Sequence, residues 1–405
     1  MKTPLPGASV NRRTALLTLA GSALQLAGCG GSGGIDVAGL SSGGTGSFTS
    51  GTIVGLGSII VNGIRYDDSQ ATINGMRYEQ SGNPLKLGMI VTVQGSATQA
   101  SSTAGGPLRA TASTIRYDSE WRGPISSVNT GSGTFKLLGQ TVDVLAATVF
   151  DGVADLAGLA ALTGPTLVEV YGYLDPGTGR LQATRIERKT SLGDYRLSGM
   201  VQQKDAGSFT LGMSTAITTI AYGARTPQPA SWGAGTPVNV RMDSSSRALE
   251  ITTPAQQTLG GLKLDDDEAE LEGIVSAHAT SSARFSVNGI EIDASGIADL
   301  ASLGISQGML VEIEGRITGD RIVASRIQVK GSPAALKTQE TEYEFHGTLS
   351  QLDPVNHSFI LRGYNITYDP ATLKLDFQLR NELPVEVKAI LSGGGLQAVE
   401  IALED

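Results

Sequence analysis

A single pattern of strands and turns recurs along most of this 405-residue chain, and it restricts the possible fold more than any other feature of the sequence. The clearest copy spans residues 271–330, where Val311, Ile313 and Gly315 alternate with Glu312 and Glu314. Alternation with a period of two is typical of a strand that buries one face and exposes the other. The pattern therefore predicts an all-β protein, and it predicts that the carboxylates of Glu312 and Glu314 face solvent.

Four further segments repeat this pattern, and the first of them contains the hairpin signal Asn62-Gly63. Asparagine followed by glycine suits a two-residue turn because both positions need positive φ. A period of about sixty to seventy residues is long enough for each copy to form a small domain. We predict repeats 1 to 5 at residues 50–119, 120–190, 195–254, 269–331 and 341–405, with an acidic linker at residues 255–268.

Each repeat supplies three strands, a connection and two more strands. In repeats 2 and 4 the connection has leucines about three residues apart, within residues 155–162 and 298–303, which predicts one or two helical turns. Three strands, a short helix and two strands is the order of the OB-fold, a five-stranded Greek-key barrel. We therefore predict five tandem small β-barrels with an OB-fold-like order. The alternative is a different small barrel with an extra N-terminal strand.

The repeated residues also resemble a known family. A Gly-x-Ile start, a Phe-x-Val-Asn-Gly hairpin, a Gly-Met-x-Val-x-Val-x-Gly strand and an Ala-x-x-Ile exit are similar to the bacterial domain of unknown function 5666, which occurs in tandem in exported lipoproteins. The resemblance covers about residues 50–405 and is weaker in repeats 3 and 5. It implies β-barrel repeats and an envelope location. It implies no catalytic residues, because the function of the family is not established.

The N-terminus has the composition of an export signal. Lys2, Arg12 and Arg13 give a positive first region, and the apolar run that follows is too short to remain in a bilayer as a spanning helix. The Arg12-Arg13 pair also resembles a twin-arginine export motif, although Ala15 stands where phenylalanine is usual. The twin-arginine route and the general secretory route both stay open.

The signal ends in Leu26, Ala27, Gly28 and Cys29, which resembles the lipobox of bacterial lipoproteins. Cys29 is the only cysteine, so neither a disulfide nor a cysteine metal cluster competes for it. We expect Cys29 to be acylated and to become the first mature residue. Gly30 stands where aspartate would retain such a protein at the inner membrane. We therefore expect an outer-membrane lipoprotein that faces the periplasm or the cell surface.

Removal of residues 1–28 takes away three basic residues and no acidic one, which changes the formal net charge from −9 to −12. An acidic surface repels phosphate backbones, so nucleic-acid binding is disfavoured. Residues 29–49 are rich in glycine, serine and threonine, which predicts a flexible tether. The expected partners are the membrane, through the lipid on Cys29, and an envelope protein or glycan.

Catalytic motifs do not stand out in the sequence. It contains no Walker loop and no His-Glu-x-x-His motif. The three histidines, His278, His346 and His357, have no second ligand or nucleophile at a motif spacing. We therefore predict a non-enzymatic binding or scaffolding array without cofactor or metal.

Two alternatives remain open. A carbohydrate- or peptide-processing enzyme would use carboxylates such as Glu312 and Glu314, but their predicted exposure argues against a buried acid–base pair. A calcium-stabilised adhesin would use the acidic cluster Asp265–Glu268, whose spacing differs from that of an EF-hand loop.

Four aromatic residues are candidates for a binding face. They could line a surface for a glycan or peptide, or they could be packed separately in cores and at strand edges. The four residues are Trp121, Tyr171, Tyr173 and Trp232.

Overall fold

The structure is a computed structural model. The chain divides into two compact units, Met1–Asp36 and Val37–Asp405, and all described residues lie in the second unit. The structure describes residues 48–75, 84–101, 106–213, 216–254, 268–278, 283–373 and 375–404.

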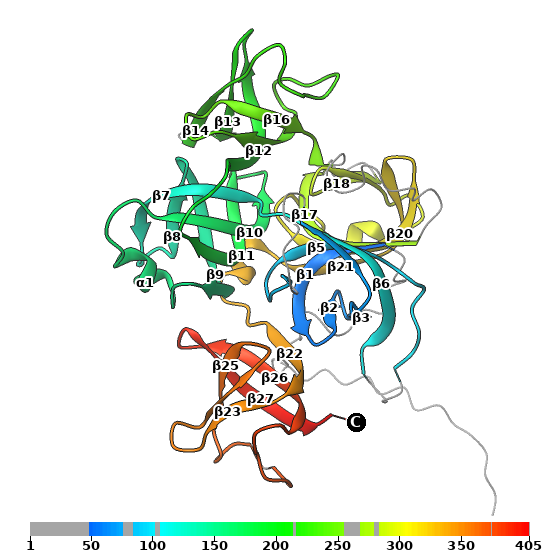
Figure 1. The fold of residues 1–405 in the computed structure, drawn as a ribbon. Coiled ribbons are helices and arrows are strands. Elements are labelled where there is room, and N and C mark those ends of the chain that lie inside the picture. Colours follow the sequence, from blue (N-terminus) through cyan, green and yellow to red (C-terminus); the bar gives the residue numbers. More distant parts are fainter. Residues whose placement is uncertain are drawn as a thin grey trace, which may run out of the picture. The chain divides into compact units, whose positions relative to one another are not determined.

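Repeat 2 shows the arrangement of strands most completely (Figure 1). Its strands pair in the order first, second, third, fifth, fourth and back to the first, which closes a small five-strand barrel. The third and fifth strands run parallel, and the other pairs are antiparallel. The elements are β7 (Trp121–Asn129), β8 (Thr134–Leu137), β9 (Gln140–Asp151), α1 (Leu156–Ala160), β10 (Leu167–Asp175) and β11 (Arg180–Lys189).

The short helix α1 occupies the predicted connection. The Asp155 side chain accepts a hydrogen bond of 2.6 Å from the Gly158 amide, which caps the helix N-terminus. Leu156 and Leu159 are buried in the hydrophobic core of repeats 2 and 3. The spacing of the leucines therefore predicted both the helical turn and its buried side.

Repeats 1 and 4 close by the same order of pairs, and repeat 1 has an additional strand, β4, beside β6. Repeat 1 contains β1 (Phe48–Leu56), β2 (Ile59–Val61), β3 (Ile64–Asp67), β4 (Thr72–Gly75), β5 (Ile90–Gly95) and β6 (Leu108–Tyr117). Repeat 4 contains β17 (Glu268–His278), β18 (Arg284–Val287), β19 (Ile290–Asp293), the 3-10 helix η1 (Leu300–Leu303), β20 (Leu310–Thr318) and β21 (Arg321–Gly331).

Repeats 3 and 5 vary this plan. In repeat 5 the first strand is broken into β22 and β23, and in repeat 3 the third and fifth strands approach through the single bridge Ala221–Arg247 within the described residues. Repeat 3 contains β12 (Tyr195–Lys204), β13 (Ser208–Met213), β14 (Ala216–Ala221), β15 (Pro237–Met242) and β16 (Ala248–Thr252). The helix α3 (Pro333–Leu336) precedes repeat 5, which contains β22 (Glu342–Thr348), β23 (Ser350–Asp353), β24 (Ser358–Leu361), β25 (Tyr364–Thr367), β26 (Pro384–Ser392) and β27 (Gly395–Leu403).

The glycine of the first strand and the asparagine of the first hairpin form one packing unit. A Cβ atom on Gly273 of β17 would lie 2.2 Å from Asn288 Nδ2, so only glycine leaves room for this side chain. Asn288 has a φ of 49°, as the predicted turn requires. Its carboxamide accepts a bond of 2.9 Å from the Ile274 amide and donates one of 3.2 Å to the Glu272 carbonyl. The Gly-x-Ile start and the Asn-Gly hairpin therefore occur together because each needs the other.

Strand β1 belongs to more than one repeat. Inside repeat 1 it pairs with β2 and β5. Its start, Phe48–Ser50, also runs parallel to Ala269–Leu271 of β17 in repeat 4. Its end, Gly55–Leu56, runs parallel to Glu344–Phe345 of β22 in repeat 5. Backbone hydrogen bonds thus connect three repeats that are far apart in the sequence.

The hydrophobic cores follow the same connections. One buried cluster combines side chains of repeats 1 and 5, including Ile53 and Phe345. A second cluster combines repeats 2 and 3, including Trp121 and Phe209. Phe48 of β1 lies in the core of repeat 4 and is fully buried. The repeats therefore share cores, which the sequence pattern did not predict.

The described part of the chain is nearly all β and contains small closed five-strand barrels, as the sequence predicted. Among the described residues, no helix is both long enough and apolar enough to cross a membrane.

Candidate functional site

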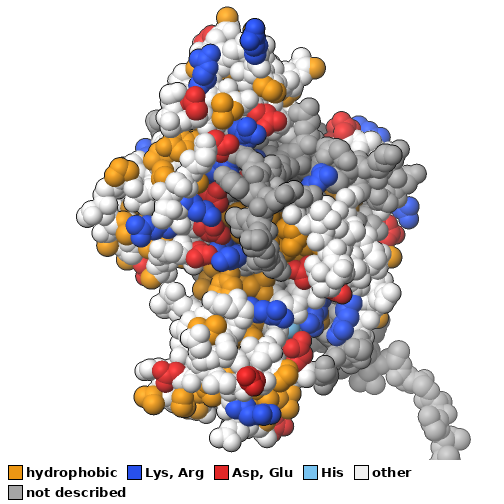
Figure 2. Space-filling view, viewed as in Figure 1, with side chains coloured by type: hydrophobic (Ala, Val, Ile, Leu, Met, Phe, Trp, Pro, Cys, Tyr) orange, Lys and Arg blue, Asp and Glu red, His pale blue; other side chains and the backbone are white. Residues whose placement is uncertain are grey.

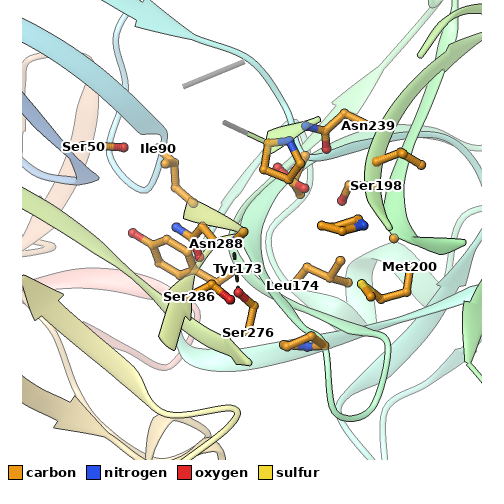
Figure 3. A pocket seen from close by; sticks show the side chains of 18 of the residues that line it. Ser50, Ile90, Tyr173, Leu174, Ser198, Met200, Asn239, Ser276, Ser286 and Asn288 are labelled. Carbon is orange, nitrogen blue, oxygen red and sulfur yellow. Dashed lines mark hydrogen bonds between the residues drawn. The ribbon is translucent and has the colours of Figure 1, made fainter. Parts of the chain in front are cut away.

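A cavity of about 780 Å³ lies where residues of repeats 1 to 4 come together. This volume is within the range of about 300 to 1,000 Å³ that is usual for small-molecule sites. Figure 3 shows the side chains of its wall, including Ser50 and Ile90 from repeat 1 and Tyr173 and Leu174 from repeat 2. Because each repeat contributes part of the wall, the cavity exists only when the repeats are assembled.

Neutral polar side chains supply many of the hydrogen-bonding groups of the wall. Ser198 and Asn239 come from repeat 3, and Ser276, Ser286 and Asn288 come from repeat 4 (Figure 3). The Ser276 hydroxyl oxygen accepts a bond of 3.0 Å from the Gly289 amide. A hydroxyl that accepts one bond can still donate its own proton. These serine and asparagine side chains therefore offer polar contacts that carry no charge.

Apolar side chains fill the space between these polar groups. Ile90, Leu174, Met200, Pro237 and Val238 all line the cavity. A site that combines apolar surface with a few placed polar groups is the usual composition of a ligand pocket. The arrangement suits a ligand with both apolar and hydrogen-bonding surface.

The charged groups of the wall are largely compensated. Arg284 lies 3.4 Å from a carboxylate oxygen of Glu291 and 3.2 Å from one of Asp293. Burial raises the pKa of Glu120, while the charge of Arg196 and a hydrogen bond with Ser198 lower it in part. A strongly charged ligand would find little uncompensated charge among these groups.

Three repeats meet at the carboxylate of Glu272, next to the cavity. The Tyr173 hydroxyl donates a hydrogen bond of 2.6 Å to Glu272 Oε1, and the Thr52 hydroxyl donates one of 3.1 Å to the same oxygen. Burial and the nearby carboxylate raise the pKa of Tyr173 well above its usual value, so this hydroxyl keeps its proton. The contact fixes the side chain of Tyr173 in the cavity wall.

The expected exposure of Glu312 is wrong. Its side chain is 2% exposed, and its Oε2 lies 2.7 Å from the ammonium of Lys330, which is also buried. Glu314 is partly exposed and lies 2.7 Å from Arg326. The alternating sequence correctly predicted that both carboxylates lie on the outer face of the barrel. It could not show that Thr52 of repeat 1 and Tyr173 of repeat 2 cover this face at Glu272.

Glu270 is a second buried carboxyl on this face. It is fully buried, and neither carboxyl oxygen has a hydrogen-bond partner among the described residues. Burial raises the pKa of Glu270 well above its usual value, and the charges of Glu312 and Glu314 raise it further. Neither Glu270 nor Glu312 lines the cavity. The pair therefore does not form an acid–base site for a substrate bound in that cavity.

The four candidate aromatic residues do not share one face. Trp121 is 1% exposed and donates its indole hydrogen to the Ser198 carbonyl at 3.1 Å. Trp232 packs edge-on against Phe209, with the ammonium of Lys204 4.0 Å from the centre of its ring. Tyr171 is buried in the core shared by repeats 1 and 5, and Tyr173 alone among the four lines the cavity. Most of the four aromatic side chains are therefore packed separately in cores and do not form a common binding face.

The histidines occupy different environments. His278 is the last residue of β17, and His357 is exposed in the turn between β23 and β24. His346 is 2% exposed and lies with Glu344 and Glu386, in a group that could hold a metal ion. The sequence did not single out this group, because Glu386 is forty residues from His346. Only the pairing of β22 with β26 places it directly opposite.

Several predicted residues lie outside the described part of the chain. The signal residues Arg12, Arg13, Leu26, Ala27 and Gly28 and the lipidation residue Cys29 are among them, as are Asp265, Asp266 and Asp267 of the acidic linker. Export, lipidation and calcium binding therefore stay predictions.

Replacing Glu270 with glutamine tests the buried carboxyl. The folded state holds the Glu270 proton, whereas the unfolded state releases it above about pH 4.5, so this group makes the folded state less stable as pH rises. Glu270→Gln should remove this loss of stability at higher pH. It should raise the free energy of unfolding at pH 7 by roughly 1 to 3 kcal/mol. Urea denaturation at pH 4.5 and pH 7.5 measures the difference. The control Glu291→Gln changes an exposed carboxylate of the same repeat, and an unchanged pH dependence in Glu270→Gln would contradict the assignment.

Comparison with known proteins identifies the repeats. Residues 122–187, 272–328 and 346–402 match the model of a family described as a domain of unknown function (DUF5666). These regions fall in repeats 2, 4 and 5, so repeat 5 matches the model although its motifs are weaker, and repeat 1 is not among the matched regions. No curated protein matches the chain.

One solved structure shares limited similarity with the chain. It is described as a multidomain protein with nucleic acid binding domains from Streptococcus pneumoniae, and it is 10% identical over 52% of this chain and 73% of that chain, with a TM-score of 0.13. A likeness of this extent supports no conclusion about fold or function. The family match is the firmer finding: three regions of the chain match the DUF5666 model, as the resemblance in the sequence predicted.

Proposed function

We propose that this protein is a non-catalytic, lipid-anchored protein of the bacterial cell envelope that binds a small uncharged polar ligand, such as a short glycan or peptide. The observation that carries the proposal is the cavity of about 780 Å³ formed jointly by repeats 1 to 4. Its size suits a ligand of a few sugar or amino-acid units. Its neutral serine and asparagine side chains suit hydroxyl and amide groups.

The strand order supports an OB-fold-like assignment for the repeats. Repeats 2 and 4 combine the pairing order first, second, third, fifth, fourth and first with a short helix between the third and fourth strands. This is the order of the five-stranded Greek-key barrel. A fold alone does not define a function, so the proposal rests on the cavity.

The charge distribution supports a partner other than nucleic acid. On the described part of the face shown in Figure 2, basic and acidic side chains are interspersed. Removal of the signal would make the net charge −12, which repels phosphate backbones. The sequence of residues 1–49 supports export, acylation of Cys29 and a flexible connection to the membrane.

Blocking the cavity tests the ligand proposal. Ser286→Trp places an indole at a lining position of β18, and Thr210→Trp makes the same kind of change on β13, the second strand of repeat 3, at a residue that does not line the cavity. The chain should bind members of a panel of short glycans and peptides. Ser286→Trp should weaken binding at least about tenfold, as expected when a ligand loses its pocket. Calorimetry with the selected compound measures the affinity.

Thr210→Trp should bind as the unchanged protein does, and thermal melting should show that both variants fold. Binding by Ser286→Trp with unchanged affinity would contradict this location of the site. Failure of the whole panel to bind the unchanged protein would contradict the proposed ligand class.

Replacing Cys29 with serine tests the anchor separately. Acylation needs the thiol, so Cys29→Ser should move the protein from the membrane fraction to the soluble envelope fraction. Cell fractionation followed by mass spectrometry of the N-terminal peptide measures both location and acylation. An unchanged membrane pool would contradict lipid anchoring.

A further inference from the structure

A buried imidazole lies among carboxylates on the outer face of repeat 5. Glu344 and His346 occupy alternate positions of β22, so their side chains point to the same face. Glu386 is directly opposite His346 on β26. One potential ligand atom from each of these residues lies within 4.8 Å of the others. The register of the two strands therefore builds a group with a nitrogen ligand and oxygen ligands.

The position of this group beside repeat 1 encloses it. Glu344 and His346 are each 2% exposed, because β22 runs next to β1 and Glu344 is the register partner of Gly55. The Glu386 side chain is 35% exposed. The group therefore has a buried end at His346 and an end open to solvent at Glu386, by which a small ion can enter.

The two nitrogens of His346 have different surroundings. Nε2 lies 2.5 Å from Glu344 Oε1. Nδ1 is buried and has no hydrogen-bond partner among the described residues, and it lies 3.6 Å from Glu404 Oε1 and 4.0 Å from Glu386 Oε2. A buried polar atom without a partner is rare in folded proteins and calls for a specific explanation, such as a bound ion.

A hydrogen bond from an N–H group at Nδ1 would need an oxygen within about 3.2 Å, and both carboxylates lie farther away. A metal ion fits better, since ligand atoms that share an ion at about 2.0 to 2.2 Å lie roughly 3.0 to 3.5 Å apart. The oxygens now 3.6 Å (Glu404 Oε1) and 4.0 Å (Glu386 Oε2) from Nδ1 lie close to that range.

The local charge also favours a cation. Glu344, Glu386 and Glu404 bring three carboxylates to His346, and Arg65 of repeat 1 lies 3.5 Å from Glu404 Oε1. The nearby ammonium of Lys388 lies 3.1 Å from Glu400. Lys388 is also the register partner of Glu344, and Arg362 donates to the His346 carbonyl at 2.6 Å. Together with Glu400, the carboxylates still outnumber these three cations, so a bound cation would be favoured.

We propose that His346 Nδ1, Glu386 and Glu404 bind a divalent transition metal ion such as Zn²⁺, and that Glu344 orients the imidazole through Nε2. A metal-binding histidine usually donates its second ring N–H to a carboxylate, which fixes the tautomer and the ring. An imidazole nitrogen with carboxylate oxygens suits Zn²⁺ better than the hard ions Ca²⁺ and Mg²⁺. The site goes beyond the ligand-binding function proposed above and does not depend on it.

Zinc titration of the full chain tests the proposal. After treatment with a chelator and dialysis, the chain should bind one Zn²⁺ per molecule in calorimetry, with a dissociation constant in the micromolar range or below. A large excess of Ca²⁺ or Mg²⁺ should not displace the ion. No zinc binding, or equal binding of Ca²⁺, would overturn the proposal.

Substitutions locate the ion. His346→Gln and Glu386→Gln should each weaken zinc binding at least about tenfold, and Glu344→Gln should weaken it by about 10- to 100-fold because it loses the support of the ring. His357→Gln, at an exposed histidine of the same repeat, should leave binding unchanged. Thermal melting without metal shows whether the variants fold, and Glu386 is exposed enough for its variant to remain informative if His346→Gln unfolds. Unchanged affinity in Glu386→Gln would overturn the assignment.

Discussion

Backbone pairing along β1 is the interaction on which the arrangement of the repeats depends. Each half of β1 pairs along one edge with a neighbour in its own barrel, which leaves the other edge for a strand of another repeat. At its start it pairs with β5 inside repeat 1 and with β17 of repeat 4. At its end it pairs with β2 inside repeat 1 and with β22 of repeat 5. Other repeats thus use backbone groups at an edge that would otherwise invite aggregation.

This pairing changes the environment of the outer barrel faces. A polar row that would contact water on an isolated barrel is enclosed where first strands run side by side. Glu270 of β17 and His346 of β22 are both buried for this reason, although both belong to outward rows. Burying such groups costs free energy unless a proton, an ion pair or a cation compensates for it. The raised pKa of Glu270, the Lys330–Glu312 pair and the proposed metal ion are three forms of that compensation.

Much of the fold within one repeat could be predicted from the sequence. Alternating residues identified the strands, Asn62-Gly63 identified a hairpin whose two residues do have positive φ, and the leucines of residues 155–162 identified α1. These signals are local, because each reflects the conformation of a few adjacent residues. The Gly-x-Ile start and the Asn-Gly hairpin also recur together for a structural reason, because the Asn288 side chain packs against Gly273.

The candidate sites could not be predicted in the same way. Nothing in the local pattern says that β1 meets β17 and β22, or that four repeats enclose a cavity. The predicted exposure of Glu312 was wrong because an alternating sequence shows which residues share a face of the sheet. It does not show which other parts of the protein cover that face. His346 and Glu386 are opposite one another only through the register of β22 and β26, which the sequence pattern leaves open.

Hydrogen exchange in a Phe48→Ala variant tests the central role of β1 most directly. The sequence placed Phe48 in the tether, but it begins β1 of repeat 1 and is fully buried in the core of repeat 4. Its loss should therefore destabilise that core by about 3 to 5 kcal/mol. Exchange should become faster in β17 and β20 of repeat 4. The matched variant Phe209→Ala, in the core shared by repeats 2 and 3, should leave these two strands protected. Unchanged protection of β17 and β20 in Phe48→Ala would show that β1 does not support repeat 4.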